Sequence, residues 1–269
     1  MWQSEKKQLS GVLTNAFGSG HKQFDYLFIH GFLESAKMWK SVVESLNSEI
    51  QFFAPDLPGH GKSEMIEGNP EIEQLADWIK PLLQQNKRPV FVVAHSLGGY
   101  LALEMANRFP DLIAGIFLLH STTIADSAER KASRDQGKRV VKTDKLRYLK
   151  PALEGLFLEQ FKPRLNSQIE TLIEEASEMK TDDIVWYLEA MKNRSSHTET
   201  IANRDFPLIY FTGEKDPILS IENHREEVKV TKPEKIFLTE NAGHMAHLEQ
   251  PAELTSALQW CIERFGQDN

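Results

Sequence analysis

The sequence predicts an α/β fold in which helices cover both faces of a mostly parallel central sheet. Short apolar segments rich in β-branched and aromatic residues alternate with longer amphipathic segments through most of the 269 residues, as in chains of βαβ units. Residues 121–205 interrupt this alternation, because they are charged, follow a helical pattern and contain no convincing strand. Such an interval is too long for an ordinary loop. We therefore expect a helical cap at 121–205, inserted into a core domain formed by residues 1–120 and 206–269.

Strands are predicted where short apolar runs end at turn-forming residues. The clearest is 90–93, whose sequence VFVV is apolar throughout, as expected of a strand buried on both faces. Strands are predicted at 11–17, 26–29, 50–54, 90–93, 115–119, 208–212 and 235–238, with a turn at 18–20 after the first. Helices are predicted where apolar residues recur at helical spacing, at 36–46, 69–85, 100–106, 221–228 and 251–265.

Bulk properties exclude several classes of protein. Hydrophobic residues make up 41% of the chain and charged residues 26%, which is ordinary for a soluble globular protein. The net charge of -8 argues against a nucleic-acid-binding protein. No apolar run reaches the roughly twenty residues of a membrane span, and the first residues lack the apolar core of a secretory signal. We expect a cytoplasmic monomer or homodimer that binds a small-molecule substrate and contacts neither nucleic acid nor membrane.

The turn after residues 90–93 carries a serine. From residue 94 the chain reads AHSLGG, and a helical pattern follows. Strand, sharp turn and helix form the context of a nucleophile elbow, G-x-S-x-G; Ala94 replaces its first glycine, whereas Gly98 is in place. Such a turn would expose the Ser96 hydroxyl and direct the N–H of Leu97 at a developing oxyanion. The alternative is that Ser96 only caps the helix.

A serine nucleophile needs a base, and the base needs an orienting acid. In this context the three follow in the order Ser, Asp or Glu, His, each after a strand. Asp216 and His244 follow the last two predicted strands. Glu214 is an alternative acid and His247 an alternative base; the spacing does not decide between the two histidines.

Further residues are expected around the site. His30-Gly31-Phe32 follows the strand at 26–29, so the N–H of Phe32 is the natural second oxyanion donor. Gly31 would let the backbone approach the substrate, although an ordinary glycine turn is the alternative. We also expect His95 and Trp186 to line the substrate pocket. For His95 the alternative is a structural role inside the elbow, and for Trp186 it is packing within the cap.

Motifs for other chemistry are incomplete. Gly61-Lys62-Ser63 has the form of the end of a phosphate-binding loop, but Asp56 stands where that motif requires glycine. The histidines are scattered, and no cysteine or carboxylate cluster has the spacing of metal ligands. We expect a structural turn at 56–63, no metal and no other cofactor.

Five segments in order resemble the α/β-hydrolase superfamily, and within it the capped esterase, enol-lactonase and C–C hydrolase branch. They are His30-Gly31-Phe32, DLPGHGKS at 56–63, AHSLGG at 94–99, GEKD at 213–216 and GHMAHLEQP at 243–251. Only 121–205 lies outside this resemblance. It implies an α/β-hydrolase fold with Ser96 as nucleophile, His244 as base, Asp216 as acid, and Phe32 and Leu97 as oxyanion donors.

The predicted reaction is hydrolysis of a small carboxylic ester, lactone or thioester through an acyl-enzyme. Two alternatives stay open: cleavage of a C–C bond or elimination by the same triad, and a low-turnover ligand-binding sensor on a hydrolase scaffold. Basic residues outnumber acidic ones at 129–150. A solvated helix face explains this excess, and the alternative is that Arg134, Arg139 or Arg147 attracts an anionic substrate.

Overall fold

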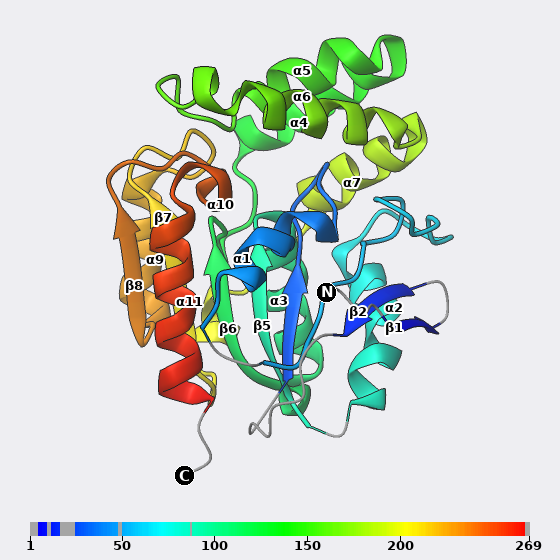
Figure 1. Ribbon diagram of the computed structural model, residues 1–269. Helices are drawn as coiled ribbons and strands as arrows, with labels where there is room; N and C mark the ends of the chain where they lie inside the picture. The colour runs from blue at the N-terminus through cyan, green and yellow to red at the C-terminus, as the bar shows by residue number, and fades with distance from the viewer. Residues whose placement is uncertain (1–4, 10–11, 17–24, 48–49, 87, 267–269) are drawn as a thin grey trace.

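A six-stranded parallel sheet forms the centre of the computed structural model, which describes residues 5–9, 12–16, 25–47, 50–86 and 88–266. Its spatial order is β4-β3-β5-β6-β7-β8, and every neighbouring pair is parallel (Figure 1). The strands are β3 (Asp25–Ile29), β4 (Phe52–Phe53), β5 (Val90–His95), β6 (Ile113–Leu119), β7 (Leu208–Gly213) and β8 (Lys235–Thr239). β1 (Glu5–Leu9) and β2 (Val12–Ala16) form a separate antiparallel pair. The predicted parallel sheet is confirmed.

Successive residues of the inner strands face two different hydrophobic cores. In β5, Val90, Val92 and Ala94 belong to one core, whereas Phe91 and Val93 belong to the other. This alternation follows from the two-residue period of a strand, and it explains why the strand is apolar at every position.

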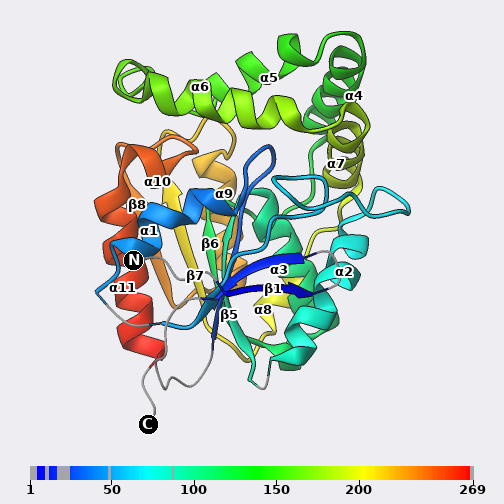
Figure 2. The same cartoon turned by 45° about the vertical axis from the view of Figure 1, so that its right-hand side comes forward.

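Helices cover both faces, as predicted. The first core is completed by α2 (Ile72–Gln85) and α3 (Leu97–Arg108), and the second by α1 (Lys40–Glu44) and α11 (Pro251–Phe265), as Figures 1 and 2 show. The remaining core elements are η1 (Ala36–Trp39), η2 (Pro110–Leu112), α9 (Ile221–Thr231) and α10 (Ala246–Glu249). Within the described residues, no helix has the length and apolar character that crossing a membrane requires.

The interval between β6 and β7, all of which the structure describes, contains helices joined by loops and no strand. Its elements are α4 (Ala128–Thr143), α5 (Lys145–Glu154), α6 (Lys162–Glu178), α7 (Thr181–Asn193) and α8 (Thr198–Ala202). Figure 1 shows α4, α5 and α6 above the carboxyl ends of the strands, whereas α8 lies beside α3 and α9. The helices therefore stand where parallel α/β sheets place their ligand crevice.

Several N-terminal elements differ from the prediction. The helix expected at 36–46 is a 3-10 turn, η1, followed by the short α1. The strand expected at 50–54 is only β4, an edge strand that pairs with β3 at two positions. β1 was not predicted, because EKKQL shows no alternation of apolar and polar residues. The turn predicted at 18–20 lies outside the described residues.

Candidate active site

Ser96 lies in a strained turn between β5 and α3. Its backbone has φ 49° and ψ -113°, a region that costs a non-glycine residue free energy and that persists only where neighbours enforce it. Here the Ser96 N–H donates to the carbonyl of Leu119 at 3.0 Å, and the Ser121 hydroxyl donates to the carbonyl of Ser96 at 2.8 Å. The Ser96 side chain makes no capping hydrogen bond to α3. The hydroxyl is therefore displayed at the carboxyl edge of the sheet.

Close backbone packing on both sides of this turn explains its small residues. A Cβ at Gly98 would lie 2.6 Å from the carbonyl oxygen of Ile29 and 2.8 Å from that of His30. Ala94, the departure from the elbow pattern, is fully buried in the first core. The structure thus accommodates the additional methyl group at Ala94, whereas Gly98 has no room for one.

Three side chains from distant parts of the chain converge at Ser96. His244 Nε2 lies 2.8 Å from Ser96 Oγ, and His244 Nδ1 lies 2.8 Å from Asp216 Oδ2. A carboxylate only accepts hydrogen bonds, so the proton of a neutral His244 ring is on Nδ1. Nε2 is then free to accept the proton of the Ser96 hydroxyl. The structure brings together the three residues expected as nucleophile, base and acid.

Asp216 is held by more than His244. Its Oδ1 accepts the N–H groups of Ile218 and Leu219 at 2.7 and 3.1 Å, and His120 Nδ1 donates to Oδ2 at 2.8 Å. Burial raises the pKa of Asp216, but His244 and His120 outweigh burial and hold that pKa well below its usual value. Asp216 therefore remains a carboxylate that can stabilise a His244 cation.

His120 is a further residue of this site, to which no role was assigned from the sequence. It directly follows β6, so its position at the carboxyl end of a buried strand was the available signal. Burial lowers its pKa to about 4, in spite of the neighbouring carboxylate of Asp216. His120 is therefore neutral and donates one hydrogen bond to Asp216. The negative charge of Asp216 remains available to a His244 cation.

His120, Asp216 and His244 also form a group with the composition of a metal site, since one ligand atom from each lies within 4.8 Å of the others. Both histidines, however, direct Nδ1 at Asp216 Oδ2 at the 2.8 Å of a hydrogen bond. Metal ligation would need these nitrogens deprotonated and directed at an ion about 2.0–2.1 Å away. The geometry fits a hydrogen-bond network and not a metal centre.

Behind His244 lies a buried pair, Glu34 and His95. His95 Nδ1 is 2.7 Å from Glu34 Oε2, and His95 Nε2 is 2.9 Å from the carbonyl oxygen of His244. Both partners only accept, so both hydrogen bonds form only when the His95 ring is an imidazolium. Burial lowers the pKa of His95, but the Glu34 carboxylate outweighs burial and raises it above its usual value. Burial raises the pKa of Glu34, and the cationic His95 brings it to about 2.

This pair makes folding stability depend on pH. The pKa of His95 is higher in the folded protein than its value of about 6.5 in the unfolded chain. Protonated His95 therefore stabilises the fold fully below about pH 6.5, and this stabilisation is lost as pH rises through the folded-state pKa. Glu34→Gln removes the negative partner. We expect the free energy of unfolding of the wild type to fall more steeply between about pH 7 and pH 9 than that of Glu34→Gln. Urea titrations across this range measure both slopes, and parallel slopes would show that His95 is neutral in the folded protein.

The two expected oxyanion donors come from the first turn of α3 and from the loop between β3 and η1. Leu97 is the first residue of α3, so its N–H is among those that a helix leaves without an intrahelical partner. Phe32 lines the same cavity as Ser96. Its loop is fixed by two buried histidines: His30 Nε2 accepts the N–H of Leu57 at 2.9 Å, and His60 Nε2 accepts the N–H of Leu33 at 3.3 Å.

The segment 56–63 forms a structural turn. Asp56 accepts the N–H groups of Ala36 at 2.8 Å and Lys62 at 3.0 Å, and its carbonyl accepts the Ser63 hydroxyl at 2.7 Å. A Cβ at Gly61 would lie 2.3 Å from the Asp56 carboxylate. Asp56 therefore holds this turn together through its carboxylate and its carbonyl group.

Of the three residues expected to bind substrate, His95 lines the cavity, Gly31 packs against Glu34, and Trp186 lies elsewhere. His95 lines the cavity, but both ring nitrogens are committed to Glu34 and His244. The Gly31 N–H donates to Glu34 Oε2 at 2.7 Å, and a Cβ there would lie 2.4 Å from that oxygen. Gly31 is thus small because Glu34 packs against it. Trp186 is not brought to the site: it lines a separate hollow, and its Nε1 donates to the carbonyl of Gly68 at 3.3 Å.

A cavity of about 480 Å³ opens at the triad. Ser96, His244 and Phe32 line it from the core, and Tyr148 of α5 and Leu188 of α7 line it from the helices above. Its volume lies within the range of small-molecule sites, about 300–1,000 Å³.

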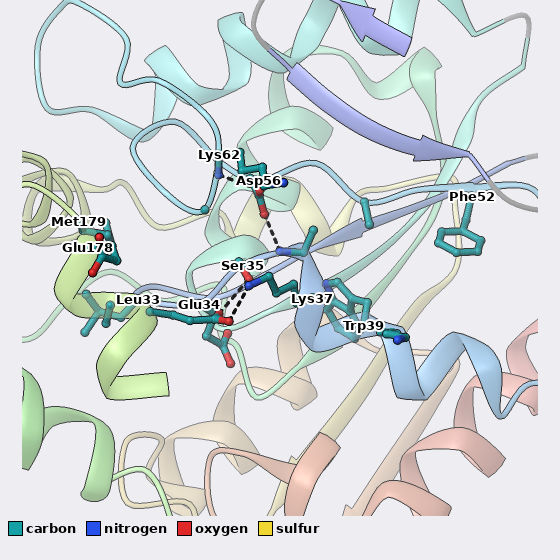
Figure 3. A pocket seen from close by; sticks show the side chains of 16 residues that line it. Leu33, Glu34, Ser35, Lys37, Trp39, Phe52, Asp56, Lys62, Glu178 and Met179 are labelled. Carbon is teal, nitrogen blue, oxygen red and sulfur yellow. Dashed lines mark hydrogen bonds and ion pairs between the residues drawn. The ribbon is translucent and has the colours of Figure 1, made fainter. Parts of the chain in front are cut away.

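A second pocket, of about 400 Å³, lies between η1, β4 and the end of α6 (Figure 3). Lys37 of η1 pairs with Glu175 of α6 across it, with Nζ and Oε1 2.7 Å apart. Neither Ser96 nor His244 is among its lining residues. This pocket shares Leu33 and Glu34 with the cavity at the triad, but the triad residues do not line it.

Comparisons with known proteins agree with the fold. The family model described as alpha/beta hydrolase fold matches residues 27–251. The chain is 22% identical to an (E)-2-((N-methylformamido)methylene)succinate hydrolase from Acinetobacter baylyi, over 97% of this chain and 98% of the relative. It is 24% identical to a 2-succinyl-6-hydroxy-2,4-cyclohexadiene-1-carboxylate synthase from Klebsiella pneumoniae, over 92% and 97%. A thermophilic esterase from Thermogutta terrifontis superposes with a TM-score of 0.84 at 22% identity, covering 98% of each chain.

Proposed function

Because the chain belongs to the α/β hydrolase family, we propose that it is a serine hydrolase that cleaves a small carboxylic ester, lactone or thioester through an acyl-enzyme. The observation that carries the proposal is the continuous line of hydrogen bonds from Ser96 through His244 to Asp216. A hydroxyl is a weak nucleophile until a base accepts its proton, and this geometry supplies that base.

The proposed mechanism follows from these contacts. As Ser96 Oγ attacks the substrate carbonyl, His244 Nε2 takes its proton, and Asp216 holds the imidazole tautomer and stabilises the imidazolium. The N–H groups of Leu97 and Phe32 bind the oxyanion; loss of one such donor typically costs about 10²–10³ in rate. His244 then protonates the leaving alcohol, and water, activated by His244, releases the acid from Ser96.

Helices α4–α7 act in this proposal as a lid over the site. Residues of α4, α5 and α7 line the same cavity as Ser96, and the His244 N–H donates to the carbonyl of Leu156, which follows α5, at 2.8 Å. The lid therefore encloses a small-molecule substrate and also positions the base. The residues that carry the reaction are side chains and N–H groups of the chain itself, and the proposed reaction involves no cofactor.

The test is a panel of p-nitrophenyl esters of increasing acyl length. We expect saturable hydrolysis by the wild type, with a preference for acyl chains that the cavity holds. A protein that hydrolyses none of them would contradict the proposed ester chemistry.

A second candidate reaction is supported by the synthase relative, which shows that a similar chain serves a reaction not named as hydrolysis. Ser96 and His244 could instead initiate C–C bond cleavage or elimination. Turnover of a β-diketone in the absence of any ester hydrolysis would favour this second reaction.

A further inference from the structure

We propose that the preferred substrate is a small ester carrying a second, ionised carboxylate, which Arg130 and Arg134 of α4 bind while Ser96 attacks the ester. This inference rests on the proposed function and names the substrate class. The two arginines and Ser96 line the same cavity. Arg130 and Arg134 are four residues apart on α4, which puts both side chains on one face of the helix.

The cavity has an excess of positive charge, although the whole chain has a net charge of -8. Three arginines, Arg130, Arg134 and Arg147, line the cavity. Arg134 Nε pairs with Asp126 at 2.5 Å, but Asp126 does not line the cavity and also pairs with Arg194. The Arg130 side chain has no ion-pair or hydrogen-bond partner among the described residues. The carboxylate that does line the cavity, Glu34, is paired with buried His95. An anionic group of the substrate would offset this excess.

Neutral donors stand beside the arginines. Tyr100 and Tyr148 line the cavity, and neither phenolic hydroxyl forms a hydrogen bond with a described residue. Burial raises the pKa of Tyr148 to about 12, while the positive charges of Arg134 and Arg130 act in the opposite direction. Both arginines and Tyr148 line the same cavity. Guanidinium and phenol groups together are suited to bind the two oxygens of a carboxylate.

The structure also shows which of the three arginines proposed from the sequence to attract an anionic substrate lie at the cavity. Arg134 and Arg147 line the cavity. Arg139, on the same helix, is exposed, lines a different hollow and donates to Gln136 Oε1 at 2.7 Å. Arg130 replaces Arg139 as a candidate, and Arg139 becomes the matched control.

The experiment compares p-nitrophenyl hydrogen glutarate with p-nitrophenyl pentanoate, which has the same acyl chain length but ends in a methyl group. After subtraction of spontaneous hydrolysis, we expect wild-type kcat/KM to favour the acidic ester by about tenfold or more, since hydrogen bonds to charged groups are among the strongest. In Arg130→Gln and in Arg134→Gln this ratio should fall about tenfold. In Arg139→Gln it should remain at the wild-type value.

The outcomes distinguish failure of the carboxylate site from failure of the proposed hydrolase function. If the wild type hydrolyses both esters equally well, or if Arg139→Gln lowers the ratio as much as Arg130→Gln, the inference is overturned while the proposed function stands. If neither ester is hydrolysed, the proposed function fails, and calorimetric titration with glutarate tests the carboxylate site by itself. Binding to the wild type that weakens at least tenfold in Arg130→Gln supports the site; no binding, or equal binding, overturns it.

Discussion

Replacing Ser96 with alanine should lower kcat/KM for p-nitrophenyl ester hydrolysis by about 10³-fold or more, because removing the nucleophile of a triad leaves only the contribution of binding and of the oxyanion donors. Among the described residues, the hydroxyl of Ser96 has one hydrogen-bond partner, His244 Nε2. Its removal therefore disrupts no packing that another part of the fold needs. Steady-state kinetics of the purified variant measure this loss.

Two controls show that the loss is chemical. Ser96→Ala should retain the melting temperature of the wild type within a few degrees, since the backbone N–H and C=O of residue 96 keep their bonds to the Leu119 carbonyl and the Ser121 hydroxyl. Ser256→Ala, which removes an exposed serine hydroxyl on α11, is the second control and should retain wild-type activity. Activity of Ser96→Ala near that of the wild type would remove Ser96 from its proposed role.

The two histidines of the segment 243–251 should differ sharply in their effect on activity. His244→Gln should lower kcat/KM by about 10³-fold or more, because no other imidazole hydrogen-bonds to Ser96 among the described residues. His247→Gln should lower it by less than about tenfold. His247 is buried, and its Nε2 lies 3.9 Å from Glu34 Oε1. Burial lowers its pKa to about 3, in spite of Glu34, which makes it a neutral packing residue and not a base.

This pair of variants settles the choice that the spacing of the sequence left open. Thermal unfolding of both variants separates loss of activity from loss of structure, since His247 is fully enclosed and its replacement costs packing. If His247→Gln is inactive but folded and His244→Gln is active, the assignment of the base is wrong.

The sequence could predict where the three proposed triad residues lie because each of them follows a strand of the parallel sheet. Ser96 follows β5, Asp216 comes after β7 and His244 after β8. Parallel strands bring their carboxyl ends to one edge, so residues far apart in sequence become neighbours without any knowledge of side-chain packing. The same reasoning applies to His120 after β6, where it was not used.

Other features depend on contacts that no local pattern encodes. The Glu34–His95 pair joins the loop before η1 to the last residue of β5 through buried side chains, and no local sequence pattern marks this pairing. Trp186 was expected in the pocket, yet the face that α7 presents is decided by how α7 packs on α4 and on the segment near Gly68. Arg130 and Arg139 are both basic residues of α4, and only the packing of the helices over the cavity separates them.

The central claim is that Ser96 forms a covalent acyl-enzyme, and labelling with a fluorophosphonate tests it most directly. The reagent is attacked by an activated serine hydroxyl and leaves a stable phosphonyl adduct. Peptide mapping by mass spectrometry should find the adduct on Ser96 of the wild type, with labelling abolished in Ser96→Ala and in His244→Gln. An intact, folded wild type that remains unlabelled, or that carries its adduct on another residue, would contradict the claim.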